Sequence, residues 1–324
     1  MFAGRRILIV GFALAVLLFG LLNRARASDP TPPPQPDKGP GGKEDAHKGS
    51  KKCEYGSGDT QYWSFEPDQP APAKAPVIVF CHGWSAMDPR AYGPWIEHIV
   101  RRGNIVVYPR YQATLTTAPV TFTDNAITAL KHALAELAKP GHVQPDLDHV
   151  ATLGHSFGGG VCVNLAALAQ KKGLPKFKAV MPVEPGTGLF GAGFFQDYSQ
   201  IPEDTLLLCV AGEEDYLTRD IDAKRFFYQA SKIPQANKNL IVMVSDKHGK
   251  PPLTAEHLFP SALGTGSPFQ TYGLWKWFDA LTDAAFYGKN RQYALGNTPE
   301  QRFMGKWSDG QPVAEPKVIS EPGK

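Results

Sequence analysis

Ser156 stands in a glycine-rich pentapeptide, Gly-His-Ser-Phe-Gly, that covers residues 154–158 and continues with two more glycines. A serine on a sharp turn between a strand and a helix can act as a nucleophile, because the turn lifts its hydroxyl out of the sheet. An apolar strand-like run, residues 149–153, precedes the motif, and an apolar helix-like segment, residues 157–170, follows it. This context predicts a catalytic nucleophile at Ser156. The alternative is a glycine-rich turn with an idle serine.

A second motif, His82-Gly83-Trp84, directly follows a β-branched apolar run at residues 76–81. When the nucleophile sits on a strand-to-helix turn, a loop at this place supplies one backbone N–H to the oxyanion hole, and the residue after the nucleophile supplies the other. We therefore expect the N–H groups of Trp84 and Phe157 to stabilise a developing oxyanion, and Gly83 to contact the substrate. His82 precedes the nucleophile and is interpreted as structural. The alternative for this motif is an ordinary glycine in a strand–loop junction.

Carboxylates and histidines follow the last two predicted strands. Residues 211–215, Ala-Gly-Glu-Glu-Asp, come directly after the strand at 205–210, and a carboxylate is needed to orient a catalytic histidine. Both His248 and His257 lie beyond the strand at 240–244. A proline-containing loop between them is able to bring either one back over the sheet, so the sequence order Ser, acid, His leaves two candidates for the histidine.

Alternating strands and helices predict an α/β fold with a mostly parallel sheet and helices on both of its faces. Ligands bind such sheets beyond the carboxyl ends of the strands, and every candidate residue above follows the end of a predicted strand. The strands are predicted at residues 62–65, 76–81, 104–108, 149–153, 178–183, 205–210 and 240–244, and the helices at 90–102, 123–138, 157–170, 219–231 and 269–286.

The order of these motifs resembles the α/β-hydrolase superfamily. The His-Gly-Trp loop, the Gly-His-Ser-Phe-Gly-Gly turn and a late acid and histidine occur in that order, and the resemblance covers about residues 60–287. Within the superfamily the chain resembles the compact esterases near dienelactone hydrolases, chlorophyllases and polyester hydrolases. Those enzymes hydrolyse carboxylic esters with a Ser-His-Asp triad. The resemblance therefore implies ester hydrolysis here, with no cofactor and no metal ion.

The same resemblance implies which acid and which histidine complete the triad. These esterases place the aspartate a few residues beyond a strand and after a glycine, which points to Asp215, with Glu214 as the second choice. Their histidine is often surrounded by apolar residues. His257, in the run Glu-His-Leu-Phe-Pro, is therefore favoured, and His248 stays open because four residues past a strand is also a common place for it.

The surroundings of the site predict an open pocket. Only about twenty residues separate the strands at 178–183 and 205–210, too few for a large cap domain. A glycine-rich aromatic segment, residues 186–195, is interpreted either as a mobile apolar wall for the substrate, with Phe190 as a contact, or as a loop packed on the core. Tyr111 is expected at the edge of the pocket. The substrate is expected to be a small-molecule or polymer ester.

The N-terminus carries targeting features. A short basic stretch, sixteen apolar or glycine residues and an Ala-Arg-Ala sequence make residues 1–27 a predicted signal peptide; an uncleaved membrane anchor is the alternative. Export is therefore expected, to the periplasm or the medium. Residues 28–52 are rich in Pro, Gly and Lys and are predicted to form a disordered tether to a membrane or cell wall. Residues 53–289 are predicted to form the catalytic domain, and residues 290–324 an extension that packs on it.

Charge and cysteine content narrow the function further. The chain has 34 basic and 31 acidic residues, and residues 1–27 hold four arginines and no acid, so the remainder has 34 − 4 = 30 basic residues against 31 acidic ones. No basic tract with interleaved aromatics is present, so nucleic acid is not an expected partner. Three cysteines lie in apolar runs and are predicted to be buried thiols, whereas the state of Cys53 is left open. No cysteine spacing resembles a zinc site.

Two further interpretations compete with an esterase. A serine peptidase or an acyltransferase would use the same triad, although peptidases of this fold usually carry a large extra domain for which the chain has no room. A catalytically inactive binding module, tethered by its proline-rich stem, would need none of these side chains. Ser156, Asp215 and two late histidines argue against it.

Overall fold

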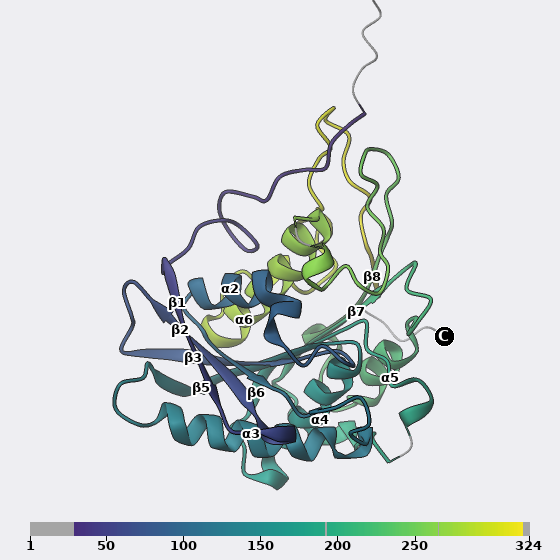
Figure 1. The fold of residues 1–324 in the computed structure, drawn as a ribbon. Coiled ribbons are helices and arrows are strands. Elements are labelled where there is room, and N and C mark those ends of the chain that lie inside the picture. The colour runs from purple at the N-terminus through teal and green to yellow at the C-terminus, as the bar shows by residue number, and fades with distance from the viewer. Residues whose placement is uncertain (1–28, 192, 265, 320–324) are drawn as a thin grey trace, which may run out of the picture.

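A mixed sheet of nine strands crosses the protein (Figure 1), as seen in a computed structural model that describes residues 29–191, 193–264 and 266–319. The strand order is β1-β2-β4-β3-β5-β6-β7-β8-β9; the central neighbours pair in parallel, and the outer pairs β1/β2, β2/β4 and β8/β9 are antiparallel. The strands are β1 Gly49–Tyr55, β2 Tyr62–Asp68, β3 Lys74–Cys81, β4 Ile105–Pro109, β5 Gln144–His155, β6 Phe177–Val183, β7 Leu206–Gly212, β8 Lys238–Met243 and β9 Lys317–Ile319.

Helices cover both faces of this sheet. In β3 the alternate residues Val77 and Val79 belong to one hydrophobic core and Ile78 and Phe80 to the other, because successive side chains of a strand point to opposite faces. Helices α3, α4 and α5 supply the first core and α2 and α6 the second, which Figure 1 shows as layers below and above the sheet. The helices are α2 Gly93–Arg101, α3 Phe122–Leu137, α4 Phe157–Lys172, α5 Ile221–Gln229, α6 Lys276–Tyr287 and α7 Pro299–Arg302, with a π-helical segment, Phe269–Trp275, before α6.

The predicted α/β fold is confirmed, including the absence of a large cap. The described residues between β6 and β7 form only short 3-10 turns, such as Tyr198–Gln200. Without an inserted helical layer there, the carboxyl ends of the central strands are left accessible. The extension after α6 packs on the domain through buried residues that include Leu295, Met304 and Trp307, and its strand β9 pairs with β8.

The predicted tether at residues 28–52 is wrong for the described part of that segment. Gly41 donates its backbone N–H to the buried carboxylate of Asp279 on α6 at 2.8 Å, and Ser308 donates its N–H to the carbonyl of Thr31. A side chain at Gly41 would collide with the Thr271 carbonyl, its Cβ lying only 2.0 Å away. Composition misled here because the segment is ordered by backbone hydrogen bonds and close glycine packing, not by apolar side chains.

The N-terminal prediction is addressed only in part by the structure. Residues 1–27, predicted as a signal peptide, lie outside the described residues. Among the described residues, no helix has the length and apolar character needed to cross a membrane. The chain enters the sheet at β1, earlier than the predicted domain boundary at Cys53. All four cysteines are free thiols in the structure; Cys53 is half-buried and the other three are buried.

Candidate active site

Ser156 occupies a strained turn between β5, which ends at His155, and α4, which begins at Phe157. Its φ of 56° and ψ of −125° are unusual for a residue with a side chain, and such conformations persist only where neighbours enforce them. A Cβ at Gly154 would lie 2.1 Å from the Gly158 carbonyl oxygen, and one at Gly158 would lie 2.2 Å from the carbonyl of Cys81. The glycines of the motif are therefore required for the close approach of α4 to β5 and β3.

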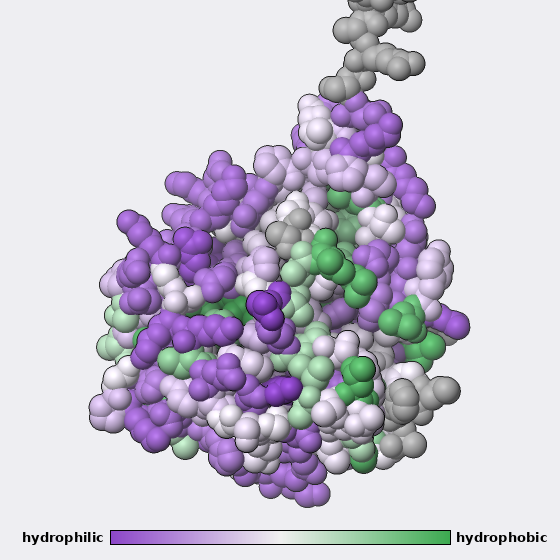
Figure 2. All heavy atoms as spheres, viewed as in Figure 1, coloured by the Kyte–Doolittle hydropathy of each residue, from purple (hydrophilic) through white to green (hydrophobic). Residues whose placement is uncertain are grey.

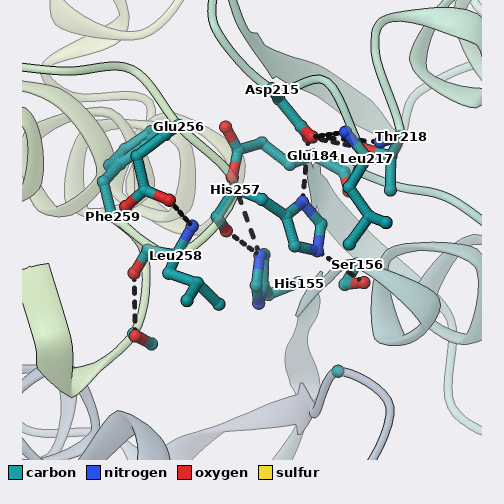
Figure 3. Close-up of polar contacts among 12 residues, drawn as sticks. His155, Ser156, Glu184, Asp215, Leu217, Thr218, Glu256, His257, Leu258 and Phe259 are labelled. Carbon is teal, nitrogen blue, oxygen red and sulfur yellow. Dashed lines mark hydrogen bonds and ion pairs between the residues drawn. The ribbon is translucent and has the colours of Figure 1, made fainter.

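The structure brings Ser156, His257 and Asp215 together (Figure 3). His257 Nε2 lies 2.9 Å from Ser156 Oγ, and His257 Nδ1 lies 2.9 Å from Asp215 Oδ2. Since the Asp215 carboxylate can only accept a hydrogen bond, the neutral His257 ring carries its proton on Nδ1. Its Nε2 is then free to accept the proton of Ser156. The three side chains come from the start of α4 and from the loops that follow β7 and β8.

The carboxylate of Asp215 is held ionised by its donors. Besides His257, it accepts hydrogen bonds from the backbone N–H groups of Leu217 and Thr218 and from the Thr218 hydroxyl. Burial opposes ionisation, but these hydrogen bonds outweigh it and lower the pKa of Asp215 below its usual value. A fixed negative charge at this place can orient His257 and stabilise its imidazolium form.

The two residues expected to supply the oxyanion donors, Phe157 and Trp84, lie near the serine turn. Phe157 is the first residue of α4, where backbone N–H groups have no partner within the helix. The His-Gly-Trp loop touches the turn from the other side, since a Cβ at Gly83 would lie 3.3 Å from Ser156 Cβ. The Trp84 ring packs against Phe157 with ring centroids 5.7 Å apart. His82 is buried beneath the loop and stacks on Tyr111.

Comparison with known proteins agrees with this architecture. The chlorophyllase family model matches residues 66–193, a segment that contains the His-Gly-Trp loop and the Ser156 turn. The chain has the α/β-hydrolase fold. Over the matched segment the hydrolase is similar to chlorophyllases, whereas Asp215 and His257 lie beyond that segment. No curated protein matches the chain.

The second candidate histidine of the hydrolase lies apart from the serine. His248 Nε2 is 2.8 Å from Asp309 Oδ2 in the C-terminal extension, and its ring packs against Trp307. Glu214, the second choice for the acid, pairs with Lys247 at 3.1 Å. The structure therefore brings neither alternative to Ser156.

A cleft of about 490 Å³ opens beside Ser156 and His257. Gly83, expected to contact the substrate, lines it together with Trp84. Tyr111 does not, and this prediction is wrong: its side chain is fully buried against His82, to whose carbonyl its hydroxyl donates a hydrogen bond. Its place after a strand end suggested the pocket, but the ring stacks on the buried His82 instead. The side chain of Phe190 lies outside the described part of the structure.

Three buried groups at the site were not predicted from the sequence as functional: Tyr92, His155 and Glu184. His155 is the second residue of the pentapeptide, and Glu184 directly follows β6, so an acid at a strand end was the available signal. The ligand atoms of His155, Glu184 and His257 lie within 4.8 Å of one another, close enough to hold a metal ion. However, both ring nitrogens of each histidine already have hydrogen-bond partners, which fits a hydrogen-bonded network better than a metal centre.

Proposed function

We propose that this hydrolase cleaves carboxylic esters through an acyl-enzyme formed on Ser156, with His257 as general base and acid and Asp215 as the orienting carboxylate. The position of the His257 ring carries the proposal, because its two nitrogens lie 2.9 Å from Ser156 Oγ and from Asp215 Oδ2. These are the distances needed for proton transfer by a general base. The chlorophyllase match supports a hydrolase that acts on esters.

The proposed reaction has two halves. As Ser156 Oγ attacks the ester carbonyl carbon, His257 Nε2 takes the hydroxyl proton, and the carbonyl oxygen becomes an oxyanion that the N–H groups of Trp84 and Phe157 stabilise. The bond to the alcohol oxygen then breaks, and the alcohol leaves with the proton from His257. Water gives a proton to His257 and attacks the acyl carbon, after which the acid leaves and Ser156 regains its proton.

The cleft favours a neutral, apolar ester. Among the described residues that line it, there is no Lys, Arg, Asp or Glu. Leu217, Leu258 and Leu263 lie on its rim, and Leu217 and Leu263 are 74% and 81% exposed. Figure 2 shows hydrophobic patches set among hydrophilic residues on the face drawn. Because apolar side chains gathered at a cleft mark a binding surface, we propose a small-molecule or polymer ester with an apolar acyl or alcohol group.

Ester turnover by the wild type and by Ser156→Ala tests this proposal. We expect the wild type to hydrolyse p-nitrophenyl acetate and butyrate, and Ser156→Ala to lose about 10⁶-fold in kcat. Ser261→Ala is the matched control, because Ser261 also lines the cleft but its hydroxyl donates to the Leu258 carbonyl. Wild-type protein without turnover of either ester, or equal losses in the two variants, would contradict the proposal. Turnover of peptide amides, abolished in Ser156→Ala, would favour a peptidase.

We also propose that the hydrolase is exported, with residues 1–27 removed. The basic start, the apolar stretch and the Ala-Arg-Ala sequence support this. N-terminal sequencing of the protein from the cell envelope or the medium should find a chain that begins near Ser28. An intact chain recovered only from the cytosol would contradict export.

A further inference from the structure

A chain of buried hydrogen bonds connects the His-Gly-Trp loop with the loop that carries His257. The Gly83 N–H donates to the Tyr92 hydroxyl oxygen at 3.0 Å, and that hydroxyl lies 2.8 Å from His155 Nδ1. On the other side of the same ring, His155 Nε2 lies 2.8 Å from the carbonyl oxygen of His257. Side chains from η2 (Pro89–Tyr92) and from the end of β5 therefore bridge two loops that are far apart in the sequence.

For a neutral His155, one arrangement of protons satisfies all three contacts. The Tyr92 oxygen accepts a hydrogen bond from the Gly83 N–H, and the Tyr92 hydroxyl can donate its own hydrogen to His155 Nδ1. With Nδ1 as acceptor, a neutral imidazole carries its proton on Nε2, where it can donate to the His257 carbonyl. A second proton on His155 would place a donor at Nδ1, so the Tyr92 hydroxyl could no longer donate there and would have to direct its own proton elsewhere. The three contacts are therefore fully satisfied with a neutral His155.

The surroundings keep His155 in that state. His155 is 3% exposed, and burial together with the neighbouring His257 lowers its pKa to about 3. Glu184 Oε2 is 3.6 Å from His155 Nε2. However, burial, with Asp215 and Glu256 nearby, raises the pKa of this carboxyl well above its usual value, which weakens its tendency to carry a charge beside the ring. The Tyr92 ring is wedged against Phe80, with centroids 5.0 Å apart, which fixes its hydroxyl.

We propose that Tyr92 and His155 form a positioning pair that holds the oxyanion-hole loop and the main chain of His257 in register with Ser156. The pair acts through Gly83 and through the His257 carbonyl, and touches no reacting atom in the proposed reaction. The inference rests on the proposed function for its kinetic consequence. A displacement of about 1 Å of catalytic groups from their reactive geometry can lower the rate on the order of 10²-fold.

Four substitutions test the individual hydrogen bonds of this network. Tyr92→Phe removes the hydroxyl and keeps the ring, and His155→Leu removes both contacts of the imidazole. His155→Asn keeps an acceptor near the place of Nδ1, and His155→Gln keeps a donor near the place of Nε2. The matched control is Tyr198→Phe, because Tyr198 is equally buried and donates its hydroxyl to Asn164 Oδ1 at 2.9 Å, outside the residues that line the cleft.

Steady-state kinetics with p-nitrophenyl butyrate provide the first readout. We expect kcat to fall on the order of 10²-fold in Tyr92→Phe and His155→Leu, with KM within about twofold. His155→Asn and His155→Gln should each lie between His155→Leu and the wild type, with an unchanged pH profile because His155 does not titrate. Tyr198→Phe should keep the wild-type kcat at a similar loss of Tm. Equal kcat in Tyr92→Phe and Tyr198→Phe would overturn the proposal.

Amide hydrogen exchange provides a readout that does not depend on catalysis. Tyr92→Phe should speed exchange in residues 83–86 and 255–263, and Tyr198→Phe should not. Unchanged exchange in both loops of Tyr92→Phe would overturn the positioning role even if the wild type is fully active. If the wild type proves inactive on esters but Tyr92→Phe still exchanges faster than the wild type in these loops, the bridge is sustained and the proposed function is rejected. If His155→Leu does not fold, Tyr92→Phe and His155→Gln carry the same test.

Discussion

Asp215→Asn is the substitution whose consequence follows most fully from the geometry. Asp215 Oδ1 accepts two backbone N–H groups, those of Leu217 and Thr218, each at 3.0 Å. The amide nitrogen of an asparagine cannot lie there, because it would face two donors. It must therefore take the Oδ2 position, opposite His257 Nδ1. There it can only donate, so the imidazole must move its proton from Nδ1 to Nε2.

With a proton on Nε2, His257 cannot accept the proton of Ser156. Misplacing that proton costs a Ser-His-Asp hydrolase about 10⁴-fold in kcat, which corresponds to about 5 kcal/mol of transition-state stabilisation. We expect that loss in Asp215→Asn, measured with saturating p-nitrophenyl butyrate, and a KM within a few-fold of wild type.

The neighbouring acid provides the control for Asp215→Asn. Glu214 pairs with Lys247 and makes no contact with the His257 ring among the described interactions, so Glu214→Gln should stay within about twofold of the wild-type kcat. If Asp215→Asn retained more than about a tenth of the wild-type rate, or if Glu214→Gln showed the larger loss, the reasoning about the imidazole proton would be refuted.

Three other substitutions have defined outcomes. His257→Ala should lower kcat by at least about 10⁴-fold and His248→Ala by no more than a few-fold in the same assay; the reverse order would exchange their roles. Asp279→Asn should lower the free energy of unfolding at pH 7. Burial opposes ionisation of Asp279, but His98 and Arg102 outweigh it and keep its pKa low. The difference in free energy of unfolding between Asp279→Asn and the wild type should therefore shrink as pH falls below about 4. A difference that stays constant with pH in urea titrations would contradict this. Glu184→Gln should be more stable than wild type at pH 7 and equal to it near pH 4, because a raised pKa destabilises the fold only where the unfolded carboxyl is ionised. A gain of the same size at both pH values would contradict the raised pKa.

The central strands could be predicted from the sequence because they are buried on both faces. Runs such as residues 76–81 and 205–210 are continuously apolar, which distinguishes them from edge strands. The edge strands β1 and β9 are short or polar, and nothing in their composition separates them from loops. They form because the partner strands β2 and β8 offer unpaired backbone groups.

The position of Ser156 could be predicted for a local reason, whereas the histidine could only be favoured: the resemblance pointed to His257 and left His248 open. The close packing of the turn leaves no room for side chains at Gly154 and Gly158, so glycines are required there, and these glycines are visible in the sequence. His248 and His257 both follow β8, and their separation depends on an isolated bridge between Asp246 and Leu253. This bridge leaves His248 beside Asp309 in the C-terminal extension, a partner that no local pattern could reveal.

The ordered N-terminal segment was missed for a different physical reason. Sequence composition measures how much apolar surface a segment can bury, and this one has little to bury. Its order comes instead from a buried acid on another element, since Asp279 on α6 binds both Arg102 and the Gly41 N–H. Backbone hydrogen bonds to a distant carboxylate leave no periodic signal in the segment itself.

Covalent labelling followed by peptide mapping tests the central claim most directly. A fluorophosphonate forms a stable bond to an activated serine hydroxyl and reports the nucleophile without assuming a natural substrate. The proposed function predicts one adduct per chain, on the peptide that contains Ser156, and at least about 10³-fold slower labelling in His257→Ala. An unlabelled wild-type chain, or an adduct on a different serine such as Ser261, would contradict it.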